Sequence, residues 1–293
     1  MKSEILVIIV SFNGMHWLER CISSVLASDV PGDILVIDNG STDGSVEWLQ
    51  KHGIEVIAND SNLGFGAANN VGLKKALEEG YSYAYLLNQD AWVEKDTFRK
   101  LVSAMDDGRF GILSPVQYDA GGKKMDRQFA KRCKRYMKKQ SGSDIVEVPF
   151  VMAAHWMISR GCLQKVGGFS PAFSMYGEDD NYIDRAHWFG FKTGVVPEAR
   201  GIHDRADRPE TPERRMFLKC NASVVHVSNP APWELARLLW EPLRLVLIGC
   251  LHFSGAPFRF IGKLIKRYPE LLRYRRKSRK AGAFLIPEKK KKR

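Results

Sequence analysis

The chain has 293 residues, of which 44% are hydrophobic and 11% aromatic, so it can bury a sizeable core and is too apolar for an intrinsically disordered protein. Its formal net charge of +12 lies at the end of the chain, because residues 259–293 contain 15 Lys or Arg and only two Glu, whereas residues 1–258 are close to neutral. A folded body without a basic field does not attract a polyanion, so we expect no nucleic-acid partner.

Two further features concern the cellular setting. The five cysteines are scattered, odd in number and without C-x-x-C spacing, so neither a disulfide framework nor a zinc site is predicted, and a reducing cytosol fits best. The apolar run at residues 5–10 is short, β-branched and without a cleavage site, so it predicts a strand rather than a secretory signal.

The first half of the chain alternates strands and helices. Residues 5–10 form the continuous apolar run that a strand buried on both faces requires, and Ser11 to Gly14 end it. The same alternation continues with a helix within 17–26, a strand at 34–37, a helix near 45–51, a strand at 55–57, a helix near 67–79 and a strand at 84–87. This pattern predicts an α/β fold with a parallel, nucleotide-binding half.

Charged clusters mark the second half. Residues 123–139 carry nine Lys or Arg against Asp126 alone, which predicts an exposed loop or helix, with a solvated charge run as the alternative. An apolar stretch follows at 148–158, then a Gly-Gly-Phe turn at 167–169 and an acidic cluster at 178–180 that is expected to open a helix.

Acidic residues follow strands or turns at three places, namely Asp38, Asp90 and the cluster at 178–180. Ligands of open α/β sheets bind outside the carboxyl ends of the strands, so carboxylates at these positions can converge on one crevice. For each acid alone, a helix N-cap or a turn is the alternative, and Asp43 is expected to cap the next helix.

Five motif-like fragments occur in a fixed order: VIIVSFNG at 7–14, VIDNGSTDGS at 36–45, NLGFGAANNVG at 62–72, LLNQDAWV at 86–93 and MYGEDDNYIDRA at 175–186. On these fragments the chain resembles the family 2 glycosyltransferases, especially the rhamnosyltransferase-like members of bacterial surface-polysaccharide synthesis. The resemblance runs from about residue 4 to about residue 226. It implies a GT-A fold, which is a Rossmann-like mixed sheet flanked by helices.

The resemblance implies a divalent metal site. Asp90 takes the place of the last acid in the family's D-x-D-like motif, which reads Asn88-Gln89-Asp90 here, and His203 matches a histidine that often completes the site. Mg²⁺ and Mn²⁺ prefer oxygen ligands and often take only one or two carboxylates, with phosphate oxygens and water completing the shell. A structural role is the alternative for His203.

The resemblance also places a nucleotide-sugar donor at the strand ends. Asp38 would contact the base or ribose, and the glycines and asparagines of the loop at 62–72 would approach the nucleotide, with a plain turn as the alternative. The residues expected to bind the donor are Ser11, Asn13, Asp38, Asn39, Asn62, Gly64, Gly66, Asn69, Asn70, Asn88, Gln89, Asp90 and Arg185.

Asp179 matches the family's E-D pair and is predicted to be the general base that takes the acceptor's proton, with Glu178 beside it to orient the acceptor or tune the pKa. Attack opposite the leaving diphosphate inverts the anomeric centre. Many relatives read E-D-x-D, whereas this chain has Asn181 at the second Asp position, and the alternative is that the acids only cap a helix. Weaker matches place three further side chains near the acids, diphosphate or acceptor: Arg185, Arg215 and Asn221.

The C-terminal region is amphipathic between residues 233 and 253, and its longest uncharged run, 245–258, is too short to span a bilayer. Pro242 is expected to divide this segment into two helices. Apolar faces next to the basic residues 259–293 favour peripheral attachment to an anionic inner leaflet over simple packing on the core. The terminal KKKKR is compatible with disorder, and the stretch 123–139 could face headgroups or an acceptor pyrophosphate.

We therefore expect a GT-A domain at 1–228 and a helical, basic, membrane-associating region at 229–293. The predicted enzyme is an inverting glycosyltransferase that moves a sugar from a UDP- or dTDP-linked donor to a lipid-linked glycan acceptor, on the cytoplasmic face of the cell membrane. The alternatives are a nucleotidyltransferase, for which Ser11 to Met15 lack the Gly-rich basic loop, and an inactive nucleotide-sugar-binding scaffold.

Overall fold

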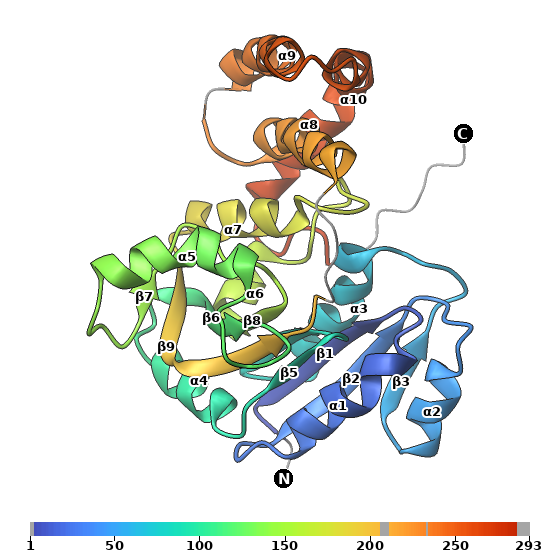
Figure 1. Ribbon diagram of the computed structural model, residues 1–293, viewed down its shortest axis with the longest axis vertical. Helices are drawn as coiled ribbons and strands as arrows, with labels where there is room; N and C mark the ends of the chain where they lie inside the picture. The colour runs from blue at the N-terminus through green and yellow to red at the C-terminus, as the bar shows by residue number, and fades with distance from the viewer. Residues whose placement is uncertain (1–2, 206–210, 233, 286–293) are drawn as a thin grey trace.

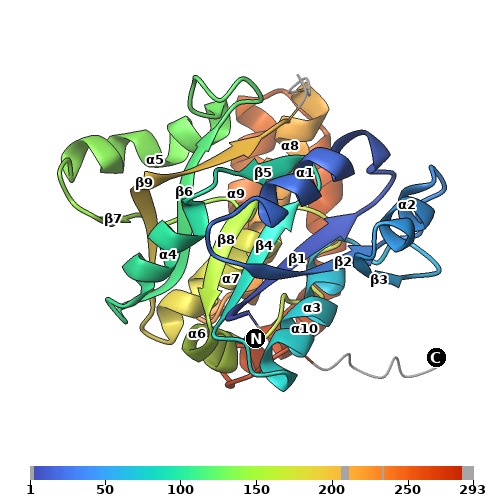
Figure 2. The same cartoon turned by 90° about the horizontal axis from the view of Figure 1, so that it is seen from below.

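The computed structural model describes residues 3–205, 211–232 and 234–285, and one mixed β-sheet lies at its centre (Figures 1 and 2). The strand order is β3-β2-β1-β4-β8-β6-β9-β5, and β7 pairs with β9. The strands are β1 Ile5–Ser11, β2 Gly32–Asp38, β3 Glu55–Ala58, β4 Tyr83–Asn88, β5 Ala91–Val93, β6 Phe110–Tyr118, β7 Val146–Glu147, β8 His155–Ser159 and β9 Lys192–His203. The parallel pairing of β1 with β2 and β4, and of β2 with β3, confirms the predicted strands.

Helices cover both faces of the sheet. They are α1 Met15–Leu26, α2 Ser45–Lys51, α3 Phe65–Glu78, α4 Thr97–Met105, α5 Arg127–Lys139, α6 Arg160–Val166, α7 Glu178–Trp188, α8 Pro212–Ser228, α9 Glu234–Leu251 and α10 Ala256–Ser278. Alternate residues of a strand face opposite ways, so Leu6 and Ile8 of β1 share an apolar cluster with α3, α5, α6 and α7. Ile5, Val7 and Ile9 share the opposite cluster with α1, α2 and α4.

The strand order reverses at β1. The chain moves from β1 to β2 and β3 on one side and to β4 on the other, and the register pairs Ser11 with Asp38 and Val10 with Asn88. The ends of these three strands therefore lie together on one edge, as the sequence predicted. Such a reversal is where a crevice opens outside the carboxyl ends of an α/β sheet.

Helices α8, α9 and α10 stack at one end of the molecule, with α9 and α10 farthest from the sheet (Figure 1). They share a third apolar cluster, to which Val224 of α8, Leu245 of α9 and Leu264 of α10 belong. Helix α8 thus packs with the two later helices although it lies before the predicted boundary at 228. No helix in residues 3–205, 211–232 and 234–285 is long and apolar enough to cross a bilayer. Trp233 and the terminal KKKKR lie outside the described residues.

The prediction that Pro242 divides its segment is wrong, because α9 continues through it from Glu234 to Leu251. Proline lacks the N–H that would bond the carbonyl oxygen of Leu238, four residues earlier. The Tyr268 hydroxyl of α10 donates to that oxygen at 2.8 Å instead. The freed acceptor has a partner, so the helix tolerates the proline.

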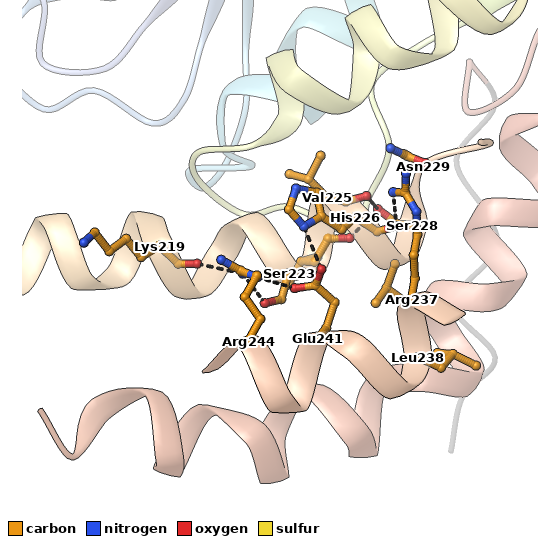
Figure 3. A network of polar contacts seen from close by, with 12 residues as sticks. Lys219, Ser223, Val225, His226, Ser228, Asn229, Arg237, Leu238, Glu241 and Arg244 are labelled. Carbon is orange, nitrogen blue, oxygen red and sulfur yellow. Dashed lines mark hydrogen bonds and ion pairs between the residues drawn. The ribbon is translucent and has the colours of Figure 1, made fainter. Parts of the chain in front are cut away.

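A polar network fastens α9 to α8 (Figure 3). The buried carboxylate of Glu241 lies 2.8 Å from His226 Nδ1 and accepts a hydrogen bond from Arg244 Nε at 2.7 Å. Burial alone would raise the pKa of Glu241, but hydrogen bonds from His226, Arg244 and Ser223 lower it to about 2. The carboxylate is therefore charged at neutral pH and holds the two helices together.

Candidate active site

The loops after β1 and β2 fix each other at the carboxyl edge of the sheet. Asn13 has a left-handed φ of 47°, and its Oδ1 accepts the N–H of Thr42 at 2.9 Å. Gln89 pairs twice with the Phe12 backbone, accepting the N–H at 2.8 Å and donating to the carbonyl at 3.2 Å. Asp43 accepts the first N–H of both α1 and α2, which confirms its predicted role as a helix cap. Predicted donor-binding residues thus build a preformed rim.

Asp38 and Ser11 are fully buried within this rim. Asp38 Oδ1 accepts the N–H groups of Gly40 and Ser41 at 3.0 and 2.8 Å, so the carboxylate shapes the loop after β2. Ser11 Oγ has no hydrogen-bond partner in the described part of the chain. A buried hydroxyl without a partner is uncommon and is consistent with a ligand contact, which remains a prediction for both residues.

The glycine-rich loop runs from β3 to α3 and approaches the acidic cluster. Asn39 Oδ1 accepts the N–H of Leu63 at 3.4 Å, and Asn62 Oδ1 accepts that of Gly64 at 2.8 Å. Gly64 has a φ of 82°, and a Cβ there would lie 2.9 Å from the carbonyl oxygen of Ser174. A Cβ on Gly66 would lie 2.9 Å from the Cβ of Phe169 and 3.9 Å from that of Glu178. Glycine is needed here because the loop packs directly on the segment that opens α7.

Three predicted donor-binding side chains are used inside the protein. Asn69 donates to the Phe65 carbonyl of its own helix at 2.9 Å, and Asn70 pairs with both backbone groups of Phe169, at 2.6 and 3.0 Å. Arg185 is fully buried and donates to the carbonyl oxygens of Gly168, at 2.7 Å, and of Val166. Because Arg185 satisfies carbonyls at the end of α6, the expectation that it pairs with the acids or a phosphate is wrong.

Asp90 and His203 form a buried pair where β5 meets the end of β9. The antiparallel pairing of Ala91 with His203 brings them together, with His203 Nε2 3.4 Å from Asp90 Oδ1. Both side chains are about 5% exposed, and His203 Nδ1 has no hydrogen-bond partner among the described residues. The predicted juxtaposition is confirmed.

This pair fits one side of a divalent-cation site. Neighbouring ligands of an octahedral ion bound at about 2.1 Å lie about 3 Å apart, close to the observed Nε2–Oδ1 distance. In the ranges that the structure describes, no group of three or more His, Cys, Asp or Glu side chains could hold a metal. Asp90 and His203 would therefore supply two ligands and leave positions for phosphate oxygens and water.

The acidic cluster opens α7 after Gly177, whose left-handed φ of 92° turns the chain into the helix. Burial, followed by the charge of Asp180, raises the pKa of Glu178 to about 7 and that of Asp179 well above its usual range. Glu178 Oε2 is buried without a partner among the described residues. A hydrogen bond from the backbone N–H of Glu178 lowers the pKa of its carboxyl in part, so one oxygen contributes to capping α7 while Oε2 has no described partner.

Several neighbours of the acids were not assigned by the sequence. Arg132 of α5 lowers the pKa of both Asp179 and Asp180, so the basic stretch 123–139 contributes a cation near the acids. Tyr176, with a left-handed φ of 64°, receives a hydrogen bond on its carbonyl from Asn221 of α8. The only sequence signal for Arg132 was the charge run itself, because nothing local indicates which residue of a basic helix faces another helix.

Asn181, the departure from the family pattern, is fully buried and donates to Ser228 Oγ at 3.5 Å. It therefore faces α8 rather than the sheet edge. The second acid of the E-D-x-D pattern is replaced here by a side chain used in helix packing.

Comparison with known proteins agrees with this geometry. The sequence profile "Glycosyl transferase family 2" matches residues 6–167. The chain is 26% identical over 238 residues to the N-acetylglucosaminyl-diphospho-decaprenol L-rhamnosyltransferase of Mycobacterium tuberculosis, covering 70% of this chain and 78% of that protein. It is 21% identical over 268 residues to the dTDP-rhamnosyl transferase RfbF of Shigella flexneri, covering 86% and 88%.

A solved structure has the same fold. The mannosyltransferase PcManGT from Pyrobaculum calidifontis, in complex with GDP-Man and Mn²⁺, superposes with a TM-score of 0.58 at 16% identity, covering 95% of this chain and 74% of that one. The profile match, which spans more than half of the chain, and the mixed sheet lead to one conclusion. The chain belongs to glycosyl transferase family 2 and is a nucleotide-sugar-dependent glycosyltransferase with the GT-A fold.

Proposed function

We propose that this chain transfers a sugar from a UDP- or dTDP-linked donor to a hydroxyl group, with inversion at the anomeric carbon. One observation carries the proposal: the chain has two acidic groups with different surroundings, Asp90 just after β4 and the cluster that opens α7 beside the glycine-rich loop. Asp90 is paired with His203, whereas Glu178 and Asp179 are partly buried beside like charges. Pairs of titratable groups with different environments are typical of sites that divide two chemical tasks.

Asp90 and His203 would hold the donor's divalent cation. When bound, such a cation stabilises the negative charge that develops on the departing diphosphate. The rim of Ser11, Asn13 and Gln89 would position the nucleotide beside it, because its loops are already locked by hydrogen bonds. Preformed positioning lowers the entropic cost of reaching the reacting geometry.

Asp179 would accept the proton of the acceptor hydroxyl as it attacks the anomeric carbon. Burial raises the pKa of Asp179 well above its usual range, and a carboxylate with a raised pKa is a stronger base than an ordinary one when it is ionised. The charge of Glu178 is among the causes that raise the pKa of Asp179. Glu178 therefore tunes the base and lies where it can also orient the acceptor.

The relatives suggest the substrate class. One is named for transfer to a diphospho-decaprenol-linked sugar and another for a dTDP-rhamnosyl donor. We propose a lipid-linked diphosphate glycan as the acceptor, within the synthesis of a cell-surface polysaccharide.

Helix α9 supports a membrane-facing orientation for this acceptor. Four exposed leucines repeat every four positions, and with the adjacent Trp240 they form what we call the α9 ridge: Leu239, Trp240, Leu243, Leu247 and Leu251. Such a ridge at the end of the molecule suits shallow insertion into a lipid surface, and exposed Arg and Lys of α10 suit anionic headgroups. We propose peripheral attachment to the inner face of the membrane.

The test is to measure nucleoside diphosphate release from UDP- and dTDP-sugars with Mn²⁺ and a lipid-linked acceptor, and to determine the product's anomeric configuration by NMR. We expect inverted product from wild type and none from Asp90→Ala. Retained configuration, or full activity of Asp90→Ala, would refute the mechanism. Release of pyrophosphate from a nucleoside triphosphate and a sugar phosphate would indicate a nucleotidyltransferase instead.

A further inference from the structure

A cavity of about 790 Å³ lies between α8 and α10. The residues that carry the argument are four cations and two aromatic rings: Arg215, Lys219, Arg259, Lys263, Phe217 and Phe260. None of the four cations forms an ion pair with a residue that the structure describes. Glu213 is the only acid among the described residues of the lining, which therefore carry an excess of positive charge.

A second cavity of about 860 Å³ provides an internal comparison. It is also lined by basic residues, but Arg99, Lys100 and Arg109 pair there with aspartates at 2.5 to 2.8 Å. Its cations are already neutralised by the protein. The cavity between α8 and α10 differs because none of its four cations pairs with an acid among the described residues, although Lys219 Nζ contacts His252 Nε2. Such an arrangement suits an anionic ligand.

One residue of the cavity lining contacts the segment that precedes the acidic cluster. Phe217 lines the cavity and also packs edge-on against Tyr176, with ring centroids 6.3 Å apart. Tyr176 precedes Glu178 by two residues, and Asn221 of α8 fixes its carbonyl. A ligand held by α8 and α10 would therefore have one end beside the proposed base.

The opposite side of the cavity leads to apolar surface. His252 and Ser254, from the turn between α9 and α10, line the cavity. The neighbouring Leu251 and Phe253 are 75% and 99% exposed, and Leu251 is the last member of the α9 ridge. The cations therefore lie between the acidic cluster and the ridge, as an amphiphile with a central anionic group would need.

We propose that this cavity binds the diphosphate of an isoprenoid-linked glycan acceptor, with the sugar directed toward Asp179 and the hydrocarbon chain along the α9 ridge. Two adjacent phosphates match several unpaired Lys and Arg better than a single carboxylate would, because each phosphate offers several acceptor oxygens. This inference rests on the proposed function and assigns its acceptor subsite to α8 and α10, not to the basic stretch 123–139.

The test measures binding of farnesyl diphosphate, a soluble isoprenyl diphosphate, to the full chain. Lys219→Ala combined with Lys263→Ala should weaken this binding about 100-fold or more, because the double variant removes two charged hydrogen-bond donors. Arg276→Ala removes an exposed cation from α10 outside the cavity and should leave binding unchanged. UDP and dTDP affinity should not change in any of these variants.

Equal farnesyl diphosphate affinity in wild type and the double variant would overturn the proposal. So would a double variant that loses binding to phosphatidylglycerol vesicles but keeps farnesyl diphosphate, because the cavity would then hold a headgroup. If donor turnover is absent while the double variant still loses farnesyl diphosphate, the proposed reaction fails and the anion site stands.

Discussion

The chain has a sheet part, formed by β1 to β9 with α1 to α7, and a helical part, formed by α8 to α10. The two parts differ in the side chains that they leave exposed. The strands of the sheet part are buried between two helical layers, and its informative polar residues gather at one edge. Helices α8 to α10 share a smaller core and leave exposed the α9 ridge and the four cations of the cavity between α8 and α10. The family profile ends at residue 167, before the helical part begins. We infer that donor chemistry belongs to the sheet part and acceptor recognition to the helical part.

The largest expected effect is the loss of activity when Asp179, the proposed base, is replaced. Asp179→Asn should lower kcat by about 10² to 10⁴, because an amide cannot accept the acceptor's proton. Asp180→Asn, in the same helical turn, should cost less than about tenfold on the same scale. Steady-state kinetics of both variants at saturating donor check this. Equal losses in the two variants would mean that the cluster acts only through its summed charge.

The next effect concerns the helical part. Leu243→Glu with Leu247→Glu should weaken binding to phosphatidylglycerol vesicles by about 100-fold, because each buried Leu contributes about 1.5 to 3 kcal/mol. Leu26→Glu is the matched control, since Leu26 of α1 is 67% exposed but lies on the sheet part. Vesicle co-sedimentation measures the partitioning. A loss of similar size with Leu26→Glu would argue against a specific ridge.

A smaller effect follows from the raised pKa values of the acids. A base must be deprotonated, and burial raises the pKa of Asp179 well above its usual range, so activity should fall as the pH drops below that raised pKa. Glu178→Gln removes one charge that raises the pKa of Asp179. The acidic limb of the kcat profile should therefore move to lower pH. An unchanged limb would exclude Glu178 as the tuning group.

The same shift predicts a stability difference. Folding raises the pKa of Glu178 from 4.5 to about 7, so its ionisation destabilises the fold progressively as the pH rises between those values. Wild type should lose about 1 to 3 kcal/mol more unfolding free energy than Glu178→Gln between pH 4.5 and pH 8. Chemical denaturation at several pH values measures this.

The sequence predicted the parallel half of the sheet because apolar runs and turn residues define strands locally. It also placed Asp38 and Asp90 just after strand ends, and the structure shows that the parallel strands β1, β2 and β4 end together. The contact between Asp90 and His203 depends on the pairing of three-residue β5 with β9, and no local periodicity specifies that register. This contact was predicted from the family resemblance and not from the pattern of strands.

Two predictions from the sequence were wrong because of contacts between elements that lie far apart in the chain. Arg185 follows a cluster of acids in the sequence, which suggests an ion pair. The buried side chain instead donates to carbonyl oxygens at the end of α6. Pro242 looks like a helix end, yet a hydroxyl from α10 satisfies the carbonyl that it frees. In each case a partner from another helix reverses what the residue type predicts in isolation.

The most direct test of the account is calorimetric binding of UDP and dTDP with and without Mn²⁺ to wild type, Asp90→Ala and Asp179→Asn. We predict that Asp90→Ala loses the Mn²⁺-dependent part of nucleotide affinity, whereas Asp179→Asn keeps it. Mn²⁺-dependent affinity that survives in Asp90→Ala and disappears in Asp179→Asn would contradict the division of tasks between the two acidic groups.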